Sequence, residues 1–137
     1  MKTYSNLQEV YDTAVAGLAS QNFQPSYTII CSYRGLEGHK CAIGWCIPDE
    51  IYSPEMEGRS VDRLLDEQVY SGLFAQEIRD LFAKIDTATL SFLQSCHDSS
   101  LRDGGLLDKE GFPERLRARL RKFGEVRNLQ VPAVLTE

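Results

Sequence analysis

Residues 31–58, CSYRGLEGHKCAIGWCIPDEIYSPEMEG, decide how this chain folds. They include three of its four cysteines, its only tryptophan and one of its two histidines. Such residue types gather both in reactive sites and in tightly packed interiors. The stretch therefore indicates a structural junction that defines the fold, and it leaves open whether the same residues also frame a site.

The pattern inside this stretch predicts a β-hairpin. Residues 27–33, YTIICSY, are rich in β-branched and aromatic side chains, and the turn RGLEGH leads into a second segment, KCAIGWCI. In such a hairpin Cys31 and Cys41 lie near one another, and both are expected to be buried together with Trp45. Two proline-led helical turns follow, at Pro48 and Pro54, each with acids beside the proline.

Outside this stretch, the spacing of apolar residues predicts helices. A capping box of Ser5 and Gln8 opens a helix over residues 6 to about 20. Further helices are expected to begin after Ser60, before Phe74, at Asp86 or Thr87, and at Pro113, the last one ending near Gly124. We therefore expect a single globular domain, residues 1–137, of the α+β class, with a small antiparallel β-hairpin packed against four or five α-helices.

Composition restricts the classes of function. The chain is 42% hydrophobic and 26% charged, and its N-terminus, MKTYSNLQEVYD, lacks the apolar run of a signal peptide. We expect a cytoplasmic protein with no membrane span, reduced cysteines and no cofactor. Its net charge of −5 argues against generic nucleic-acid binding, because affinity for phosphates comes largely from Lys and Arg.

Two chemical sites are alternatives to simple burial of the cysteines. A nucleophilic site would use Cys41 as the thiolate, His97 as the base and Asp98 as the residue that orients the ring. A bond between His97 and Asp98 cannot be assumed, because adjacent helical side chains point about 100 degrees apart. A zinc site would use Cys31, Cys41, Cys46 and His97, but it lacks the closely spaced pair of ligands typical of structural zinc. Burial in the core is the favoured interpretation of the thiols.

The acids that follow the two prolines are a possible site for a hard metal ion. Asp49, Glu50, Glu55 and Glu57 supply carboxylates within a short segment. Each also has a local explanation, as a solvated acid in a proline-initiated turn. The solvated interpretation is favoured.

The basic stretch PERLRARLRKFGEVR, residues 113–127, is the first candidate for a binding surface. It contains six basic and two acidic residues, while the remainder of the chain is strongly acidic. An ordinary solvated helix has the same pattern, but guanidinium groups also suit carboxylate and phosphate partners. The expected binding residues are Arg115, Arg119 and Lys122 on one helical face, with Tyr33, Arg34 and His39 as a second candidate surface.

Four linked motifs in this stretch resemble a known group of proteins. CxYRG begins at Cys31, GxKCAxG at Gly38, IPDxxY at Ile47 and PxMEG at Pro54. In this order, and with the sequence LQxxHD at residues 93–98, they resemble an uncharacterised family of small proteins encoded by bacteria and their phages. The resemblance covers most of the chain up to about residue 98. It implies a shared fold and a phage or prophage setting, and it assigns no catalyst.

Two functions remain open at this point. The first is a small cytosolic binding protein of phage or prophage type, for example a counter-defence factor, that binds a host protein or a small anionic ligand. The second is a cysteine- and histidine-dependent enzyme or metal-binding protein centred on Cys31, Cys41, His97 and Asp98. The second function requires these four side chains to converge on one cleft, whereas the first does not.

Overall fold

The computed structural model describes residues 3–26 and 32–136. Within these ranges the helices are α1 (Leu7–Ser20), α2 (Ala42–Cys46), α3 (Val61–Leu64), α4 (Ala75–Leu81), α5 (Thr87–Asp98) and α6 (Phe112–Val126). One antiparallel sheet pairs β1 (Arg102–Asp103) with β2 (Leu106–Leu107). The α+β class is confirmed, and helices make up most of the structure.

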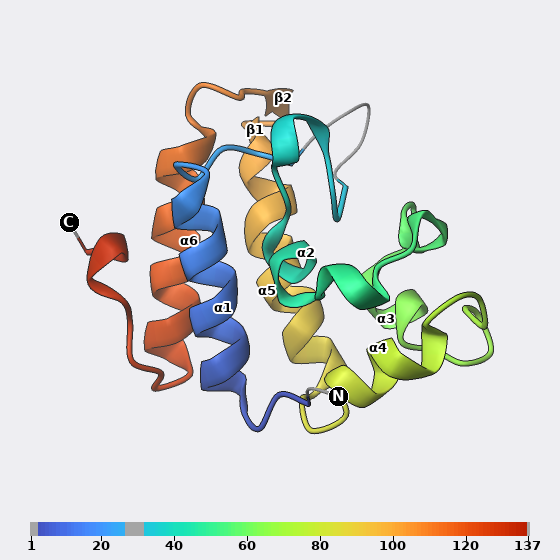
Figure 1. The fold of residues 1–137 in the computed structure, drawn as a ribbon. Helices are drawn as coiled ribbons and strands as arrows, with labels where there is room; N and C mark the ends of the chain where they lie inside the picture. Colours follow the sequence, from blue (N-terminus) through green and yellow to red (C-terminus); the bar gives the residue numbers. More distant parts are fainter. Residues whose placement is uncertain (1–2, 27–31, 137) are drawn as a thin grey trace.

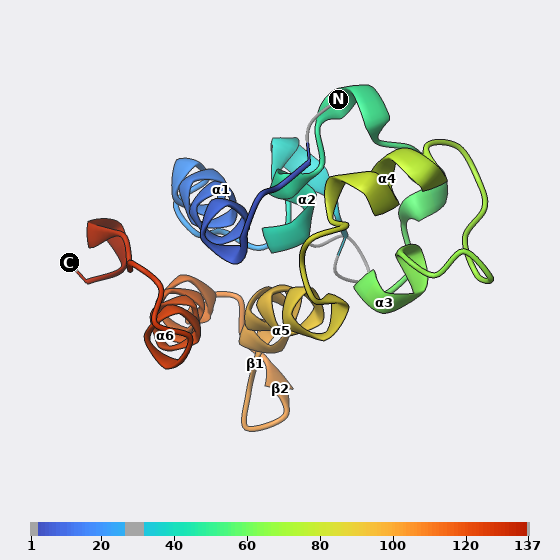
Figure 2. The same ribbon diagram turned by 90° about the horizontal axis from the view of Figure 1, so that it is seen from below.

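The helices are arranged around α5. Helices α1, α6 and α5 run side by side, α2 packs against both α1 and α5, and α3 and α4 lie on the far side of α5 from α6 (Figures 1 and 2). Because α5 contacts α2, α3 and α6, its buried residues Leu90 and Leu93 lie near the middle of one continuous apolar core. None of the helices in the described ranges is long and apolar enough to cross a membrane.

The predicted helices are present, but two differ from the prediction: α4 begins at Ala75, after Phe74 and not before it, and the helix expected after Ser60 is only the single turn Val61–Leu64. Helix α1 is capped by Asn6, whose side chain accepts from the Glu9 backbone N–H, while Glu9 accepts from the Ser5 N–H, so the expected pair at Ser5 and Gln8 is shifted by one residue. Gln8 instead exchanges two hydrogen bonds with the backbone of Gln130. Asp86 caps α5 as predicted, through the Thr89 N–H.

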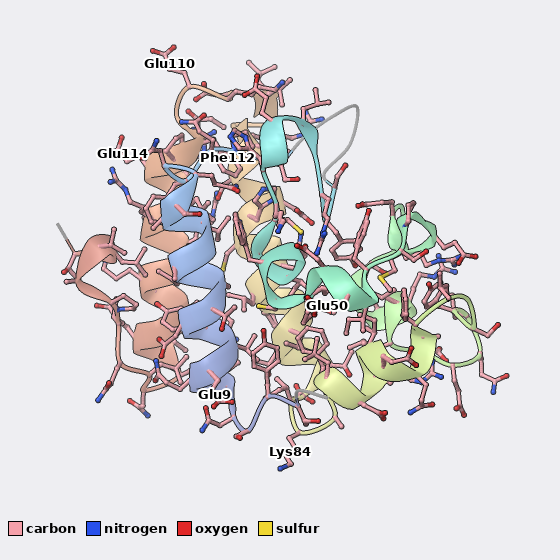
Figure 3. All side chains as sticks on the ribbon, viewed as in Figure 1. Glu9, Glu50, Lys84, Glu110, Phe112 and Glu114 are labelled. Carbon is pink, nitrogen blue, oxygen red and sulfur yellow. The ribbon has the colours of Figure 1, made fainter. Side chains whose placement is uncertain are left out.

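Helix α6 does not end at Gly124 as predicted, but continues to Val126. A Cβ at Gly124 would lie 2.6 Å from the Tyr11 hydroxyl oxygen, so glycine is needed there because α1 approaches closely. At the other end of α6, Glu110 and Glu114 project outward, whereas Phe112 is fully buried and packs edge-on against the His97 ring (Figure 3). Phe112 thus anchors α6 to α5.

The hairpin predicted for residues 27–47 is wrong in its second half. Residues 42–46 form helix α2, with Cys41 at its N-cap, and a single antiparallel bridge, Arg34–Lys40, is all the ladder described there. Of the first predicted strand, residues 27–33, the part up to Cys31 lies outside the described residues. Helix α2 begins at Cys41, whose sulfur accepts from the Gly44 N–H, and its residues Ala42, Ile43, Gly44 and Cys46 are all buried.

The sheet forms instead at residues 102–107, where no strand was predicted. Gly104 and Gly105 both have positive φ, +59° and +85°, as a tight two-residue hairpin turn requires. The signal was therefore present in the dipeptide Gly-Gly, but the flanking residues are exposed and show no alternation of apolar and polar side chains.

Candidate functional site

A single carboxylate links the motifs of residues 33–58. Glu57 accepts hydrogen bonds from the backbone N–H groups of Tyr33 (2.9 Å) and Arg34 (3.0 Å), and from the hydroxyl of Tyr52 (2.6 Å). The acid of PxMEG thereby joins CxYRG to IPDxxY. The prediction that Glu57 is merely solvated is wrong, because it has three donors from two other segments of the chain.

Arg34 belongs to the same network, which we call the motif junction and define as residues Tyr33, Arg34, Ile47, Asp49, Tyr52 and Glu57. The Arg34 guanidinium donates to the Ile47 carbonyl oxygen (2.9 Å) and forms an ion pair with Asp49 (2.7 Å). It also lies 4.2 Å above the Tyr52 ring. The positive charge of Arg34 lowers the pKa of Asp49. Arg34 is therefore committed to internal partners.

The other two residues of the second candidate surface also have internal partners. Tyr33 is buried and donates its hydroxyl proton to the Arg59 carbonyl (2.7 Å), and this burial raises the pKa of the phenol. His39 places Nδ1 3.3 Å from the Pro25 carbonyl oxygen. Tyr33, Arg34 and His39 thus serve the fold, as the interpretation of this stretch as a structural junction predicts.

Trp45 packs against the C-terminal half of α1 and against Lys40. Its indole N–H donates to Gln21 (3.0 Å), and the Lys40 ammonium lies 4.4 Å above the ring. A Cβ added at Gly17 would collide with the indole, so this glycine lets α1 approach Trp45 closely. The ring is half-buried and occupied by neighbours, which agrees with a packing role.

His97 and Asp98 do form a bond, although their adjacency made one uncertain. The Ser26 N–H donates to His97 Nε2 (3.0 Å), so the neutral ring carries its proton on Nδ1, which lies 2.9 Å from Asp98 Oδ1. Because the Nε2 lone pair is engaged by Ser26, the fully buried His97 has none left to act as a base. The pair orients Asp98 beside a hollow of about 260 Å³ that Tyr33 also lines.

The described cysteines of the alternative sites, Cys41 and Cys46, are buried in the core. Cys41 is fully buried, its sulfur accepts from the Gly44 N–H, and burial raises the pKa of its thiol well above the usual value. Cys46 donates to the carbonyl oxygens of Val10 and Ala42 in the core. In the described part of the chain, His, Cys, Asp and Glu form no cluster of three that could hold a metal. Cys31 lies outside it.

The LQxxHD sequence has a structural role as well. Gln94 accepts from the backbone N–H of Ile43 in α2 (2.9 Å) and donates to Asp98 (2.9 Å). Together with the hydrogen bond from the Ser26 N–H to His97, these contacts fasten α5 to Ser26 and to helix α2.

The basic face of α6 divides into two parts. Arg115 pairs with Asp108 (2.9 Å) and donates to the carbonyl oxygens of Ser100 and Asp108. It fastens the chain before α6 to the end of α5, so its guanidinium is already used. Arg119 and Lys122 lie farther along α6, beside a different neighbour, Arg127.

An apolar hollow of about 350 Å³ lies between α5 and α6, and we call it the α5–α6 groove. Its cations are Arg119, Lys122 and Arg127, which lie on the α6 side. Its other lining residues are Phe92, Ser95, Cys96, Ser99, Phe123 and Val126. The Phe92 and Val126 side chains are exposed, by 62% and 65%. The groove therefore combines exposed apolar surface with three cations.

None of these three cations forms an ion pair with an acid in residues 3–26 or 32–136. Arg119 donates to the Ser100 hydroxyl (3.0 Å), and Arg127 lies 4.0 Å above the Phe123 ring and 5.5 Å above that of Phe92. These contacts hold the guanidinium groups at the rim without neutralising them. The groove is thus electropositive beside an apolar floor, which suits an amphipathic anion.

A second hollow, of about 450 Å³, continues the groove on the other side of Phe92. Phe92 and Ser95 line both hollows, and Asp62, Ala88 and Ser91 complete the second one. The Ser91 hydroxyl is buried without a hydrogen-bond partner in the described structure. The two hollows together follow one face of α5 from Ala88 to Ser99.

Two of the residues at the groove were missed by sequence reasoning. Arg127 was counted in the basic stretch but not assigned to the site, and Phe92 was not singled out. The position of Phe92 in the sequence could have indicated it, because Phe92 is an apolar residue that lies away from the buried stripe of Leu90 and Leu93 on the same helix. A large apolar side chain on the polar face of an amphipathic helix is a reason to look for a partner.

Comparisons of the chain with protein-family models, with curated proteins and with solved structures find no match. The assignment of a site therefore depends on the geometry and the electrostatics described above.

Proposed function

We propose that this chain is a small binding protein whose α5–α6 groove holds an amphipathic anionic group. One observation carries the proposal: Arg119, Lys122 and Arg127 lie without acidic partners, among the described residues, around an apolar hollow flanked by exposed Phe92. Elsewhere Arg34 and Arg115 each have an acid within 3 Å. Other cations of the described chain, such as Arg63 and Arg121, also lack an acidic partner, but Arg119, Lys122 and Arg127 gather at one apolar hollow.

The apolar floor of the groove and the cations at its rim would contribute differently to ligand binding. Covering an exposed phenylalanine contributes up to about 1.5–3 kcal/mol through the hydrophobic effect. Rim cations chiefly accelerate association and select for negative charge, and their effect falls with added salt. A ligand that has only one of the two features, a purely apolar molecule or a small inorganic anion, should bind more weakly than one that has both.

The resemblance to phage-encoded proteins supports a setting for this activity. In that setting the chain would work in the host cytoplasm and bind a host component, and a counter-defence role would follow from occupying that component. The acidic remainder of the chain, which makes the net charge −5, disfavours nucleic acid as the partner.

Titration with 8-anilinonaphthalene-1-sulfonate (ANS), an aromatic sulfonate, tests the proposal on the intact protein. We expect one site whose affinity falls with salt and is at least about tenfold weaker in the variant Arg119→Glu/Lys122→Glu. The matched control, Arg63→Glu/Arg121→Glu, makes the same charge change at exposed positions that do not line the groove.

Thermal unfolding must accompany the titration, because ANS also binds partly unfolded proteins. Equal losses of affinity in the groove variant and the control would show that net charge alone governs binding, and would overturn the assignment to the groove.

A further inference from the structure

We infer that the α5–α6 groove docks an acidic amphipathic α-helix of a partner protein. This inference rests on the proposed function and adds the identity of the group that carries the anion. Three features of the groove support it: its length along α5, the absence of a backbone partner for an extended peptide, and the distribution of charge around its rim.

The two hollows together form a track of helical dimensions. Along α5 they extend from Ala88 to Ser99, and at 1.5 Å per residue this spans about 16 Å, or three turns of a docked helix. Phe92 stands between the two hollows and is the one bulky side chain among the small residues Ala88, Ser91, Ser95 and Ser99. Small residues let a second helix approach closely, while Phe92 can insert between its side chains.

The walls of the groove favour a helix over an extended strand. An extended peptide binds most firmly to an open sheet edge, where its backbone N–H and C=O groups find partners. The groove is lined by α5, α6 and the residues that directly follow them, and the backbone groups of helices are largely paired internally. A helical partner satisfies its own backbone, so it needs only side-chain complementarity here.

The charge distribution specifies the partner further. Arg119 and Lys122 lie one turn apart on α6, and Arg127 follows at its C-terminal end, so one flank of the groove is positive. The farther hollow contains an acid, Asp62. A complementary helix therefore carries Glu or Asp along the flank that meets α6, apolar residues that cover Phe92 and Val126, and no acid where it meets Asp62.

A displayed library of helical peptides of about 16 residues tests this inference on the full-length chain. Apolar residues are fixed at positions i, i+4, i+7 and i+11, and the flanking positions are randomised. We expect selected helices to be acidic along one flank and to perturb the backbone NMR signals of Phe92, Arg119 and Lys122. Phe92→Ala should weaken their binding at least about tenfold.

Charge reversal supplies the decisive control. Peptides in which the selected acids are replaced by Lys should bind Arg119→Glu/Lys122→Glu better than the original protein, because both partners of the pair are then inverted. Rescue of this kind requires direct juxtaposition, and a merely structural effect of the protein variant would not produce it.

The outcomes separate the two proposals. The helix inference would be overturned, and the proposed function would stand, if ANS binds the groove in a salt-sensitive way but the library yields no enriched helix. The same conclusion would follow if scrambled peptides bind as well as the selected ones. Enriched helices that perturb signals elsewhere on the protein would also overturn it. Loss of both ANS and peptide binding at the groove would overturn both.

Discussion

The motif junction and the α5–α6 groove are opposites in how they use charge. In the junction, Glu57 has three donors and Arg34 has an acid, a carbonyl and an aromatic ring as partners. In the groove, Arg119, Lys122 and Arg127 have no acidic partner among the described residues, and Phe92 is exposed. The junction contains the residue types expected of a site, but the groove has the unsatisfied groups that a ligand needs.

The difference shows why residue type alone is a weak guide to function. Arginine and glutamate are costly to bury without partners, so in the junction Glu57 and most of the Arg34 guanidinium are paired internally, although the buried Arg34 Nε has no hydrogen-bond partner among the described residues. A binding surface has the reverse property, because its charges and apolar groups are satisfied only when the partner arrives. We therefore expect substitutions in the motif junction to lower the stability of the fold, and substitutions in the α5–α6 groove to weaken ligand binding.

Gly44→Ala should have a large effect on stability, because it displaces Tyr33 from the motif junction. A Cβ at residue 44 would collide with the Tyr33 carbonyl, a backbone group that cannot simply rotate away. We expect the free energy of unfolding, measured by urea denaturation, to fall by about 3 kcal/mol or more.

Gly38→Ala is the matched control for this change. Residue 38 has positive φ, +75°, but nothing lies within 4 Å of the added Cβ, so the expected cost is about 1 kcal/mol of backbone strain. A Gly44→Ala protein no less stable than Gly38→Ala would contradict the close approach at Tyr33.

Phe92→Ala should leave stability nearly unchanged and weaken groove binding. Because the side chain is 62% exposed, we expect the free energy of unfolding to change by about 0.5 kcal/mol at most, while ANS affinity falls about tenfold. Phe123→Ala gives the contrast, since burial of that ring predicts a loss of about 3–5 kcal/mol in stability. Unchanged ANS affinity in Phe92→Ala would remove this residue from the binding surface.

The helices could be predicted from the sequence because their apolar spacing and caps are local signals, as Asp86 at the start of α5 illustrates. Helix α2 could not, since residues 42–46 form a short apolar run in which strand and helix patterns are hard to distinguish. The residues that line the α5–α6 groove were predicted in part. Arg119 and Lys122 were named, but helical spacing also grouped Arg115 with them, and spacing cannot show that Asp108 folds back onto Arg115.

Asp108→Asn should lower stability in a pH-dependent way. The hydrogen bond from Arg115 lowers the pKa of Asp108 below its reference value of 3.8, so the ionised carboxylate stabilises the fold at neutral pH. This contribution is complete above the unfolded-state pKa and is lost as the pH falls through the folded-state pKa. The melting temperatures of the two proteins should therefore differ at pH 7 and converge toward pH 3; a difference that persists there would exclude this ion pair as its source.

The smallest effect concerns Cys96 at the floor of the groove. Burial raises the pKa of its thiol to about 11, so little thiolate is present at pH 8. Iodoacetamide should label Cys96 more slowly than it labels free glutathione under the same conditions, and saturating ANS should slow the labelling further. Labelling as fast as that of glutathione would contradict the burial.

The most direct test of the contrast compares two variants by two measurements, the free energy of unfolding and the affinity for ANS. Glu57→Gln should lose about 2–3 kcal/mol of stability, because a carboxylate with three donors is removed, and should bind ANS as the original protein does. Arg119→Glu/Lys122→Glu should unfold nearly as the original protein does and bind ANS at least about tenfold more weakly. The opposite pattern, a folded Glu57→Gln protein with weakened ANS binding beside a groove variant that binds normally, would place the binding site in the junction and contradict this account.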